Sequence, residues 1–495
     1  MMNKPLGVLV GIVVVAGALN TAGAWYTGSK LEGVLKTSIE QGNQALATQL
    51  KGTATRATVE LVSIDRGLYS STARYRVNIQ DESAGADGQP LVMQFVDHIE
   101  HGPLPWSRIK TFKWMPVMAT SNYALEKTPS TEKWFAAAKD QSPLKGQVTL
   151  GYNRSVDAHT EMLPLELALD DNSNLSFSGL TMDAQSDADG QNIKAKGYMD
   201  HLKVHAVSAD KPPVPVELNG LTLASDLNKS PYGFYLGQNI LELSEGQLTF
   251  GERQSVAKIK NFEYAGSASA KDTLLSGRLA YTVGDITLDG KPVGSAKMVM
   301  TASSVDIPAM QSLLQIYQTK FQPHADGTLP VAQLTPAEQI QMQADLEKML
   351  AAKPQLALEN LALKTANGES QFNVAVSLAK PATFEQPPLD LVKQLVTSLE
   401  AKLQLSKPMI ADLSGVQAQL QGQTDPQIIA EIAQLNSETA GVLAVQSGLA
   451  KVEGANILAS LNYAAGQVDL NGQKMSLEEF IAAMMNRFGG MSAQE

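Results

Sequence analysis

The chain has 495 residues, and its 39 basic and 50 acidic side chains give a formal net charge of −11. A chain this acidic repels phosphate backbones, so we expect no nucleic-acid partner. The absence of cysteine excludes disulfides, zinc thiolate sites, iron–sulfur clusters and thiol nucleophiles. The length allows about two to four ordinary domains or one continuous β body, and composition alone leaves both open.

An apolar segment lies near the amino terminus. Residues 5–29 carry no charged side chain. At a rise of ~1.5 Å per residue, a helix over residues 5–26 just spans a hydrocarbon core of ~30 Å. We therefore predict a transmembrane anchor, with aromatic residues at its far interface. The residues expected to form this anchor are Leu6, Val10, Val14, Leu19, Trp25 and Tyr26.

A cleaved signal peptide is the alternative for the same segment. Lys4 would be its basic end and Ala22-Gly23-Ala24 its cleavage site. Both alternatives export residues 27–495. If the anchor is retained, Lys4 favours a single pass with residues 1–4 as a cytoplasmic tail.

The exported part is expected to have an α+β fold. An apolar helical stripe predicts a stalk helix over residues 27–52. The period then changes to two, as in TARYRVNIQ at residues 72–80, which predicts an antiparallel β-rich region over residues 53–305. Residues 306–495 are expected to form an α+β region that packs on the same sheet. Together these regions predict an extended, twisted and groove-like antiparallel sheet, with helices concentrated in the carboxy-terminal half.

Asx-Gly pairs separate many of the alternating segments. Such pairs favour two-residue hairpin turns because both central positions need a positive φ. The pairs expected to form turns are Asp87-Gly88, Asp189-Gly190, Asn219-Gly220, Asp289-Gly290, Asn367-Gly368 and Asn471-Gly472.

Helix signals are concentrated after residue 330. Thr335 and Glu338 form a capping box that opens a helix, and Ser476 with Glu479 does the same near the carboxyl end. The expected helices cover residues 336–352, 388–405 and 425–449, and a last one follows Ser476.

The stretch VDHIEHGPLPW, residues 96–106, is the strongest candidate for a metal or acid–base site. His98 and His101 flank Glu100, but a zincin needs its two histidines four apart on a helix. Gly102-Pro103 would break such a helix at once. We therefore interpret His101, Gly102 and Pro103 as a structural corner whose imidazole bonds a backbone carbonyl.

Other motifs predict no catalytic, metal-binding or cofactor-binding residue. No G-x-S-x-G, Walker A or dinucleotide fingerprint occurs, and each S-x-x-K lacks its partner motifs. Residues 185–192 resemble a calcium loop but lack the glutamate ligand at its twelfth position, so a polar hairpin tip is expected there. Residues 108–114 interleave basic and aromatic side chains, and in an acidic chain we interpret them as a solvated edge strand rather than a single-strand binder.

Several segments resemble the YdgA family of bacterial inner-membrane proteins, in the same order along the chain. They are GAWYTG at residues 23–28, DRGLYSS at 65–71, EHGPLP at 100–105 and LNGQKMSLEEF at 470–480. The resemblance implies a bacterial inner-membrane anchor and a large periplasmic domain, residues 27–495, of uncharacterised activity. A wider similarity to AsmA-like envelope proteins implies a long β groove associated with lipid. The family supplies no catalytic residue that could be transferred to this chain.

Three functional hypotheses follow. The first is a non-enzymatic protein whose sheet presents an apolar face to lipid or to an envelope component. The second is a scaffold that docks an envelope complex or self-associates through its Ala/Gln-rich helices. The third is a hydrolase that uses His101 with Glu100.

Overall fold

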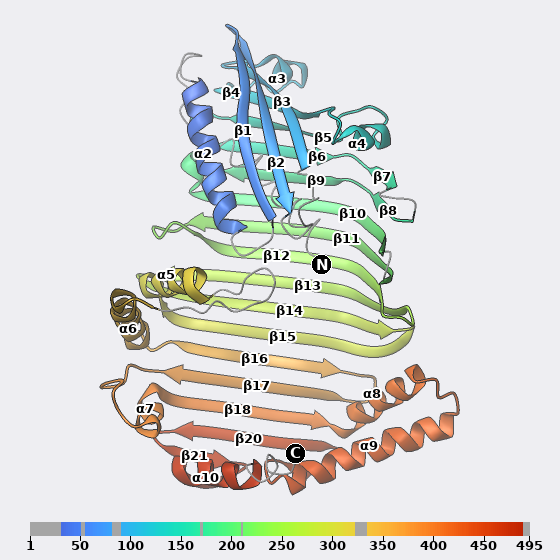
Figure 1. Cartoon of the computed structure of the whole chain (residues 1–495), viewed down its shortest axis with the longest axis vertical. Coiled ribbons are helices and arrows are strands. Elements are labelled where there is room, and N and C mark those ends of the chain that lie inside the picture. Colours follow the sequence, from blue (N-terminus) through green and yellow to red (C-terminus); the bar gives the residue numbers. More distant parts are fainter. Residues whose placement is uncertain are drawn as a thin grey trace. The chain divides into compact units, whose positions relative to one another are not determined.

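The computed structural model describes residues 31–50, 55–81, 91–168, 172–208, 211–321 and 334–488. The described chain is mostly β, and its 22 strands belong to one antiparallel sheet with helices around it (Figure 1). The antiparallel sheet predicted from the sequence is thus confirmed. The chain divides into two compact units, unit 1 with residues 1–239 and 318–333, and unit 2 with residues 240–317 and 334–495.

Unit 1 begins with helix α2 and continues as a strand meander. Its elements are α2 (Leu31–Gln49), β1 (Thr55–Arg66), β2 (Ser70–Asp81), β3 (Leu91–His101), α3 (Trp106–Lys110), β4 (Ala119–Glu126), α4 (Glu132–Ala137), β5 (Leu144–Leu150), β6 (Val156–Met162), β7 (Leu165–Ala168), β8 (Asn174–Phe177), β9 (Leu180–Ser186), the 3₁₀ turn η2 (Ala188–Gly190), β10 (Asn192–Ser208) and β11 (Lys211–Lys229). Strand β12 (Tyr235–Phe250) runs across the boundary between the units.

Unit 2 has long strands and most of the helices. Its elements are β13 (Ser255–Lys271), β14 (Leu274–Leu288), β15 (Lys291–Asp306), α5 (Ile307–Ile316), α6 (Pro336–Ala351), β16 (Gln355–Lys364), β17 (Glu369–Leu378), α7 (Pro388–Leu395), β18 (Val396–Ser406), α8 (Lys407–Leu420), α9 (Pro426–Gln446), β19 (Lys451–Glu453), β20 (Asn456–Ala464), β21 (Gln467–Leu470), β22 (Gln473–Ser476) and α10 (Leu477–Phe488). The π turn η3 (Tyr317–Phe321) follows α5, and its residues after Tyr317 belong to unit 1. Strands β13 to β18 pair in chain order, and β20 follows β18.

The core of unit 1 forms where α2 packs on the first strands. Leu35, Ile39 and Leu46 of α2 are buried together with Met93 and Phe95 of β3. The helical stripe expected within residues 27–52 is therefore part of the folded body. Asn43 fixes the contact, because its side chain accepts a hydrogen bond from the Val59 amide and donates one to the Val59 carbonyl, at 2.8 and 2.9 Å.

Two expected capping boxes are confirmed. The Thr335 hydroxyl accepts a hydrogen bond from the Glu338 amide, and the Glu338 carboxylate accepts one from the Thr335 amide. Ser476 and Glu479 make the same reciprocal bonds at the start of α10. Both helices start where the sequence predicts because these interactions lie within four residues.

Three local predictions are wrong. Asn219-Gly220 lies inside β11, and Gly220 there has a φ of +65° without reversing the chain. Residues 396–405 form β18 and not helix, since their alternation lets them pair with β17 and β20 on either side. Residues 108–114 form no edge strand. They belong to the short helix α3 and the loop after it.

The expected membrane anchor lies outside the described residues, as do Asp87-Gly88 and the leader residues Leu6, Val10, Val14, Leu19, Trp25 and Tyr26. Within the described ranges, no helix combines the length and the apolar character needed to cross a bilayer.

Candidate functional site

The sheet of unit 2 carries a continuous apolar row on one face. Hydrogen-bonded pairing aligns one side chain from each of six neighbouring strands, β13 to β18. In strand order these are Tyr264, Tyr281, Met298, Leu361, Phe372 and Leu403. We call this row and its apolar neighbours on the same side the apolar face. The two tyrosine rings at one end of the row are in contact, with centroids 5.2 Å apart.

A β-bulge keeps the apolar face continuous across β16. Leu358 pairs with Met300, and Leu361 pairs with Met298, so β16 has one extra residue between these two pairs. Without the bulge, two residues three apart would point to opposite faces of the sheet. The bulge therefore brings both leucines to the apolar face. It also leaves Glu359 on the other side, where its carboxylate accepts a hydrogen bond from Thr301 at 3.2 Å.

The opposite face of the same strands is mostly polar. The residue next to each member of the apolar row forms a second aligned row. In strand order this row contains Glu263, Thr282, Lys297, Ala362, Gln371 and Gln404. Unit 2 therefore has an amphipathic sheet with one apolar side and one water-compatible side.

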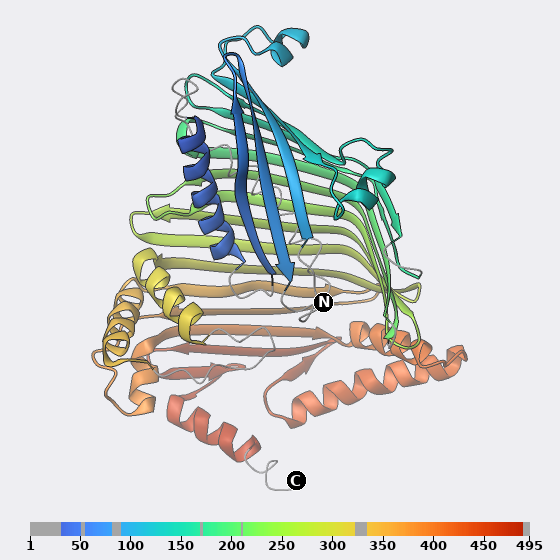
Figure 2. The same cartoon turned by 45° about the horizontal axis from the view of Figure 1, so that its top comes forward.

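The middle of the apolar face is only partly covered. Leu361 and Leu356 each keep 45% of their surface exposed, and Leu279 keeps 37%. The remaining members of the apolar row have intermediate exposure, and none of them is buried. In both views α5 and α6 lie near one end of the unit 2 strands, and α8 and α9 near the other (Figure 2). Apolar side chains that remain accessible on a broad sheet form a surface suited to an apolar ligand.

Among the described residues, the apolar face becomes a closed core at its carboxy-terminal edge. There Tyr463, Val468 and Leu477 are buried, and Phe480 and Ile481 of α10 pack against them. Helix α10 thus covers this edge of the sheet.

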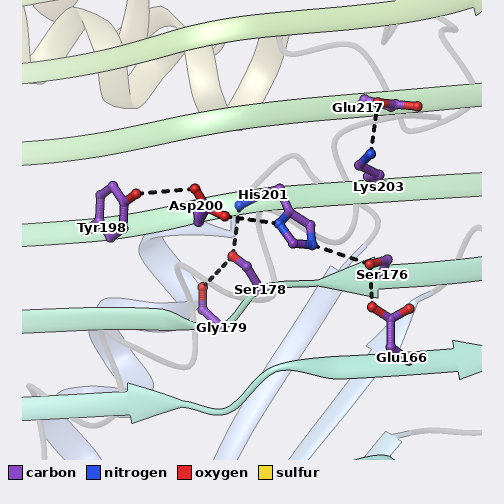
Figure 3. Close-up of polar contacts among 9 residues, drawn as sticks. All are labelled: Glu166, Ser176, Ser178, Gly179, Tyr198, Asp200, His201, Lys203 and Glu217. Atoms are coloured by element: carbon purple, nitrogen blue, oxygen red, sulfur yellow. Dashed lines mark hydrogen bonds and ion pairs between the residues drawn. The ribbon is translucent and has the colours of Figure 1, made fainter.

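A second candidate is the polar cluster around His201 in unit 1. Figure 3 shows the imidazole between Asp200 and Ser176. Its Nδ1 lies 3.3 Å from an Asp200 carboxylate oxygen, and its Nε2 lies 3.4 Å from the Ser176 hydroxyl. These are the residue types of a catalytic triad.

The hydrogen bonds of this cluster do not support nucleophilic catalysis. The Ser176 hydroxyl donates to Glu166 at 2.5 Å, so its proton points away from His201 (Figure 3). His201 is then placed to donate a hydrogen bond to the Ser176 hydroxyl. A general base would instead have to accept the hydroxyl proton of Ser176. The Asp200 side chain is 68% exposed, so water competes for its contact with the imidazole.

The cluster marks a bend shared by neighbouring strands. The ladder between β10 and β11 is interrupted at Asp200, opposite Gly220, and the His201 amide donates to the Ser178 hydroxyl at 2.8 Å. After this point the core-facing positions of β10 change from Met199 to Leu202, both of which are buried. The contacts of His201 therefore stabilise the point at which the opposite side of β10 begins to face the core.

The expected structural corner at residues 101–103 is tightly packed. His101 is buried, with Nε2 3.0 Å from the Ser71 hydroxyl and Nδ1 3.3 Å from the Leu68 carbonyl oxygen. Burial lowers the pKa of His101. A Cβ atom on Gly102 would lie 2.0 Å from the Val117 carbonyl oxygen, so only glycine fits there. Pro103 accepts a hydrogen bond from the Val117 amide at 3.0 Å.

His98 and Glu100 do not complete a site with His101. His98 is exposed whereas His101 is buried, as alternation along β3 requires. Glu100 accepts hydrogen bonds from the Ser107 amide and hydroxyl, at 2.9 and 2.6 Å, and so anchors the start of α3. Among the described residues, no group of three or more acidic, histidine or cysteine side chains is arranged to hold a metal ion.

Asp97 is a buried acid that the sequence interpretation did not single out. It accepts hydrogen bonds from Ser121 at 2.7 Å and from Tyr75 at 3.4 Å. Burial nevertheless raises its pKa to about 6. The signal was in the alternation MxFxDxIxH, which places Asp97 between Phe95 and Ile99 on the inward side of β3.

A family model described as "Bacterial protein of unknown function (DUF945)" matches residues 2–478. The chain belongs to the DUF945 family. It is similar to Protein YdgA of Escherichia coli, with 28% identity over 97% of this chain and 96% of the relative. It is also similar to the uncharacterized protein YihF of Escherichia coli, with 23% identity over 96% and 97% of the two chains. An uncharacterized protein of Haemophilus influenzae matches 63% of the chain at 19% identity.

The DUF945 match confirms the resemblance to the YdgA family, and it extends over both units.

Proposed function

We propose that this DUF945 protein is a non-enzymatic, membrane-anchored envelope protein whose apolar face binds the acyl chains of a lipid. The observation that carries the proposal is the aligned apolar row across β13 to β18, which stays accessible while the other side of the same strands is polar. A sheet that only needed stability would bury such a face under helices, as α10 does at the edge strands.

The proposed location follows from the leader and the family resemblance. Residues 5–26 anchor the chain in the bacterial inner membrane with the amino terminus in the cytoplasm, and residues 27–495 lie in the periplasm. A groove-like curvature of the sheet belongs to the same proposal, because a curved apolar surface contacts an acyl chain on more than one side.

Photocrosslinking tests the proposal with the full chain in membranes. A phospholipid with a diazirine in its acyl chain is activated, and the crosslinked peptides are identified by mass spectrometry. We expect adducts on β13 to β18. Adducts confined to residues before β1, or spread evenly over both faces of the sheet, would refute the lipid-binding face.

Two matched variants sharpen this experiment. Leu361→Glu places a carboxylate on the apolar face, and Gln404→Glu places one on the polar face. Loss of the apolar contact between Leu361 and an acyl chain should weaken the free energy of lipid binding by about 1.5 kcal/mol. Lipid adducts should therefore fall about tenfold in Leu361→Glu. Gln404→Glu should keep the level of the unmodified protein. Circular dichroism confirms that both variants fold, and equal adduct yields would contradict the proposal.

A scaffold function is the second candidate, and α9 favours it. One side of α9 packs on α8, while Leu435, Val442 and Leu443 remain 66%, 54% and 59% exposed. Such a stripe suits a helix of a partner protein or of a second copy. Crosslinking in membranes that yields only the monomer would rule out this function.

A further inference from the structure

Unit 1 exposes a cluster of large apolar side chains at one end of its first strands. We call it the aromatic tip. Its members come from the turn between β1 and β2 and from α3 and the loop that follows. They are Leu68, Tyr69, Trp106, Phe112, Trp114 and Met115, and each keeps between 59% and 81% of its surface exposed. A cluster of this size on a soluble surface usually marks an interaction site.

Backbone contacts join the two parts of the tip. The His101 amide donates to the Tyr69 carbonyl at 2.8 Å, and the His101 imidazole lies against the Leu68 carbonyl. The turn between β1 and β2 therefore lies beside the corner from which α3 starts. Figure 2 shows α3 and the turn between β1 and β2 at the same end of these strands.

The loop after α3 is held by its own hydrogen bonds. The Lys113 amide donates to the Arg108 carbonyl at 2.9 Å, and the Arg108 guanidinium donates to the Met115 carbonyl at 3.3 Å. Phe112 and Trp114 make an edge contact, with ring centroids 6.4 Å apart. The apolar side chains are thus displayed by a defined loop, and their exposure does not come from a lack of local structure.

The α3 part of the aromatic tip is basic, although the chain as a whole is acidic. Residues 101–125 contain no aspartate or glutamate but include Arg108, Lys110 and Lys113, in a chain with a net charge of −11. The Lys110 ammonium lies 5.5 Å from the centre of the Trp106 ring. Basic residues interleaved with tryptophan match the chemistry of an anionic lipid headgroup region.

The start of α2 lies at the same end of unit 1. The Arg66 guanidinium, at the end of β1, is bonded to the carboxylate of Glu32 in the first turn of α2. Helix α2 therefore runs antiparallel to β1, with its first turn near the β1–β2 turn that carries Leu68 and Tyr69. The leader immediately precedes this helix in the chain.

We propose that the aromatic tip inserts into the interface of the same membrane that holds the leader, with its basic side chains on anionic headgroups. This inference rests on the proposed anchoring. The tip supplies a second contact beside the anchor and so fixes the orientation of unit 1 on the bilayer. Tryptophan and tyrosine favour this depth because their rings are apolar with one polar group.

Single-cysteine labelling tests the inference, since the chain has no cysteine of its own. Phe112→Cys, in the tip, and Gln141→Cys, in the exposed turn after α4 at the other end of β4 and β5, each carry an environment-sensitive fluorophore on the full chain. The proteins are reconstituted in vesicles of phosphatidylcholine with about one third phosphatidylglycerol. Flotation shows anchoring, and doxyl-labelled lipids then report the depth of each probe.

We expect doxyl lipids to quench the probe at Phe112→Cys several times more strongly than the probe at Gln141→Cys. In the protein labelled at Phe112→Cys, the additional substitution Lys113→Glu should weaken this quenching. Lys139→Glu, on the exposed turn after α4, should leave it unchanged. Protein that floats with an unquenched probe at Phe112→Cys would refute the insertion of the aromatic tip and leave the proposed anchoring intact. Protein that fails to float would refute both the anchoring and the insertion of the aromatic tip. Equal quenching at the two positions would also refute the insertion.

Discussion

Asp97→Asn is expected to stabilise the protein at neutral pH and not in acid. Asp97 is 6% exposed and lies among the buried apolar residues of unit 1. Asparagine has nearly the same shape, and its amide oxygen still accepts the 2.7 Å hydrogen bond from Ser121. The substitution therefore removes a buried charge and retains the principal hydrogen bond.

The magnitude follows from the pKa of Asp97. Burial raises that pKa from 3.8 to about 6 in the folded protein. The folded state thus holds the proton more tightly, so its stability is greatest below pH 3.8 and is lost as the pH rises to about 6. A shift of this size corresponds to about 3 kcal/mol, which the unmodified protein loses across this window. The asparagine of Asp97→Asn does not titrate, so the stability of this variant does not fall across the same pH window.

Urea unfolding of the full chain between pH 4 and pH 8 measures the effect. We expect Asp97→Asn to be more stable than the unmodified protein by about 1 to 3 kcal/mol at pH 7.5, with the two converging near pH 4. Asp226→Asn is the control, because Asp226 pairs with Lys194 while 55% exposed, and its replacement should change stability by less than about 0.5 kcal/mol. A difference that does not vary with pH, or a less stable Asp97→Asn at pH 7.5, would refute the reasoning.

Three backbone and capping predictions are checked by thermal unfolding. Gly102→Ala should lower the free energy of unfolding by about 3 kcal/mol, because the new Cβ meets backbone oxygens at 2.0 and 2.8 Å, and a small effect would show that the corner is not tightly packed. Gly33→Ala, at an exposed position in α2 with nothing within 4 Å, should instead raise it by up to about 1 kcal/mol, and destabilisation would argue against the helix. Thr335→Ala removes one half of the capping box of α6 and should cost about 1 kcal/mol, so an unchanged melting temperature would contradict that cap.

Features that depend on neighbouring residues were predicted in part, since Asn367-Gly368 lacks the positive φ expected for a two-residue turn. Asp289-Gly290 and Asn471-Gly472 have positive φ at both positions and form the expected hairpin turns. The capping boxes at Thr335 and Ser476 are present for the same reason, since each is a contact between residues three apart.

Features whose local sequence signal is absent or misleading were not predicted. Ala465-Gly466 makes the turn between β20 and β21, with φ of +49° and +79°, although no Asx residue marks it. Asn219-Gly220 carries the usual turn signal but lies opposite the bend at Asp200, where β11 must follow β10. The bulge in β16 is set by two neighbouring strands at once and has no local signature.

Alternation along the sequence predicts only part of the apolar face. Each strand has apolar residues at every second position, which predicts one apolar side for each strand by itself. Whether these sides align depends on the register of five successive pairings, from β13–β14 to β17–β18. The structure supplies that register, and with it the row from Tyr264 to Leu403.

The most direct test of lipid binding places a photoreactive amino acid at single positions of the full chain in growing cells. At position 361, on the apolar face, we expect an adduct whose added mass is that of a phospholipid or one of its acyl chains. At position 404, on the opposite side of the sheet, we expect no such adduct. Lipid adducts at neither position, or in equal yield at both, would contradict the claim that this face binds lipid.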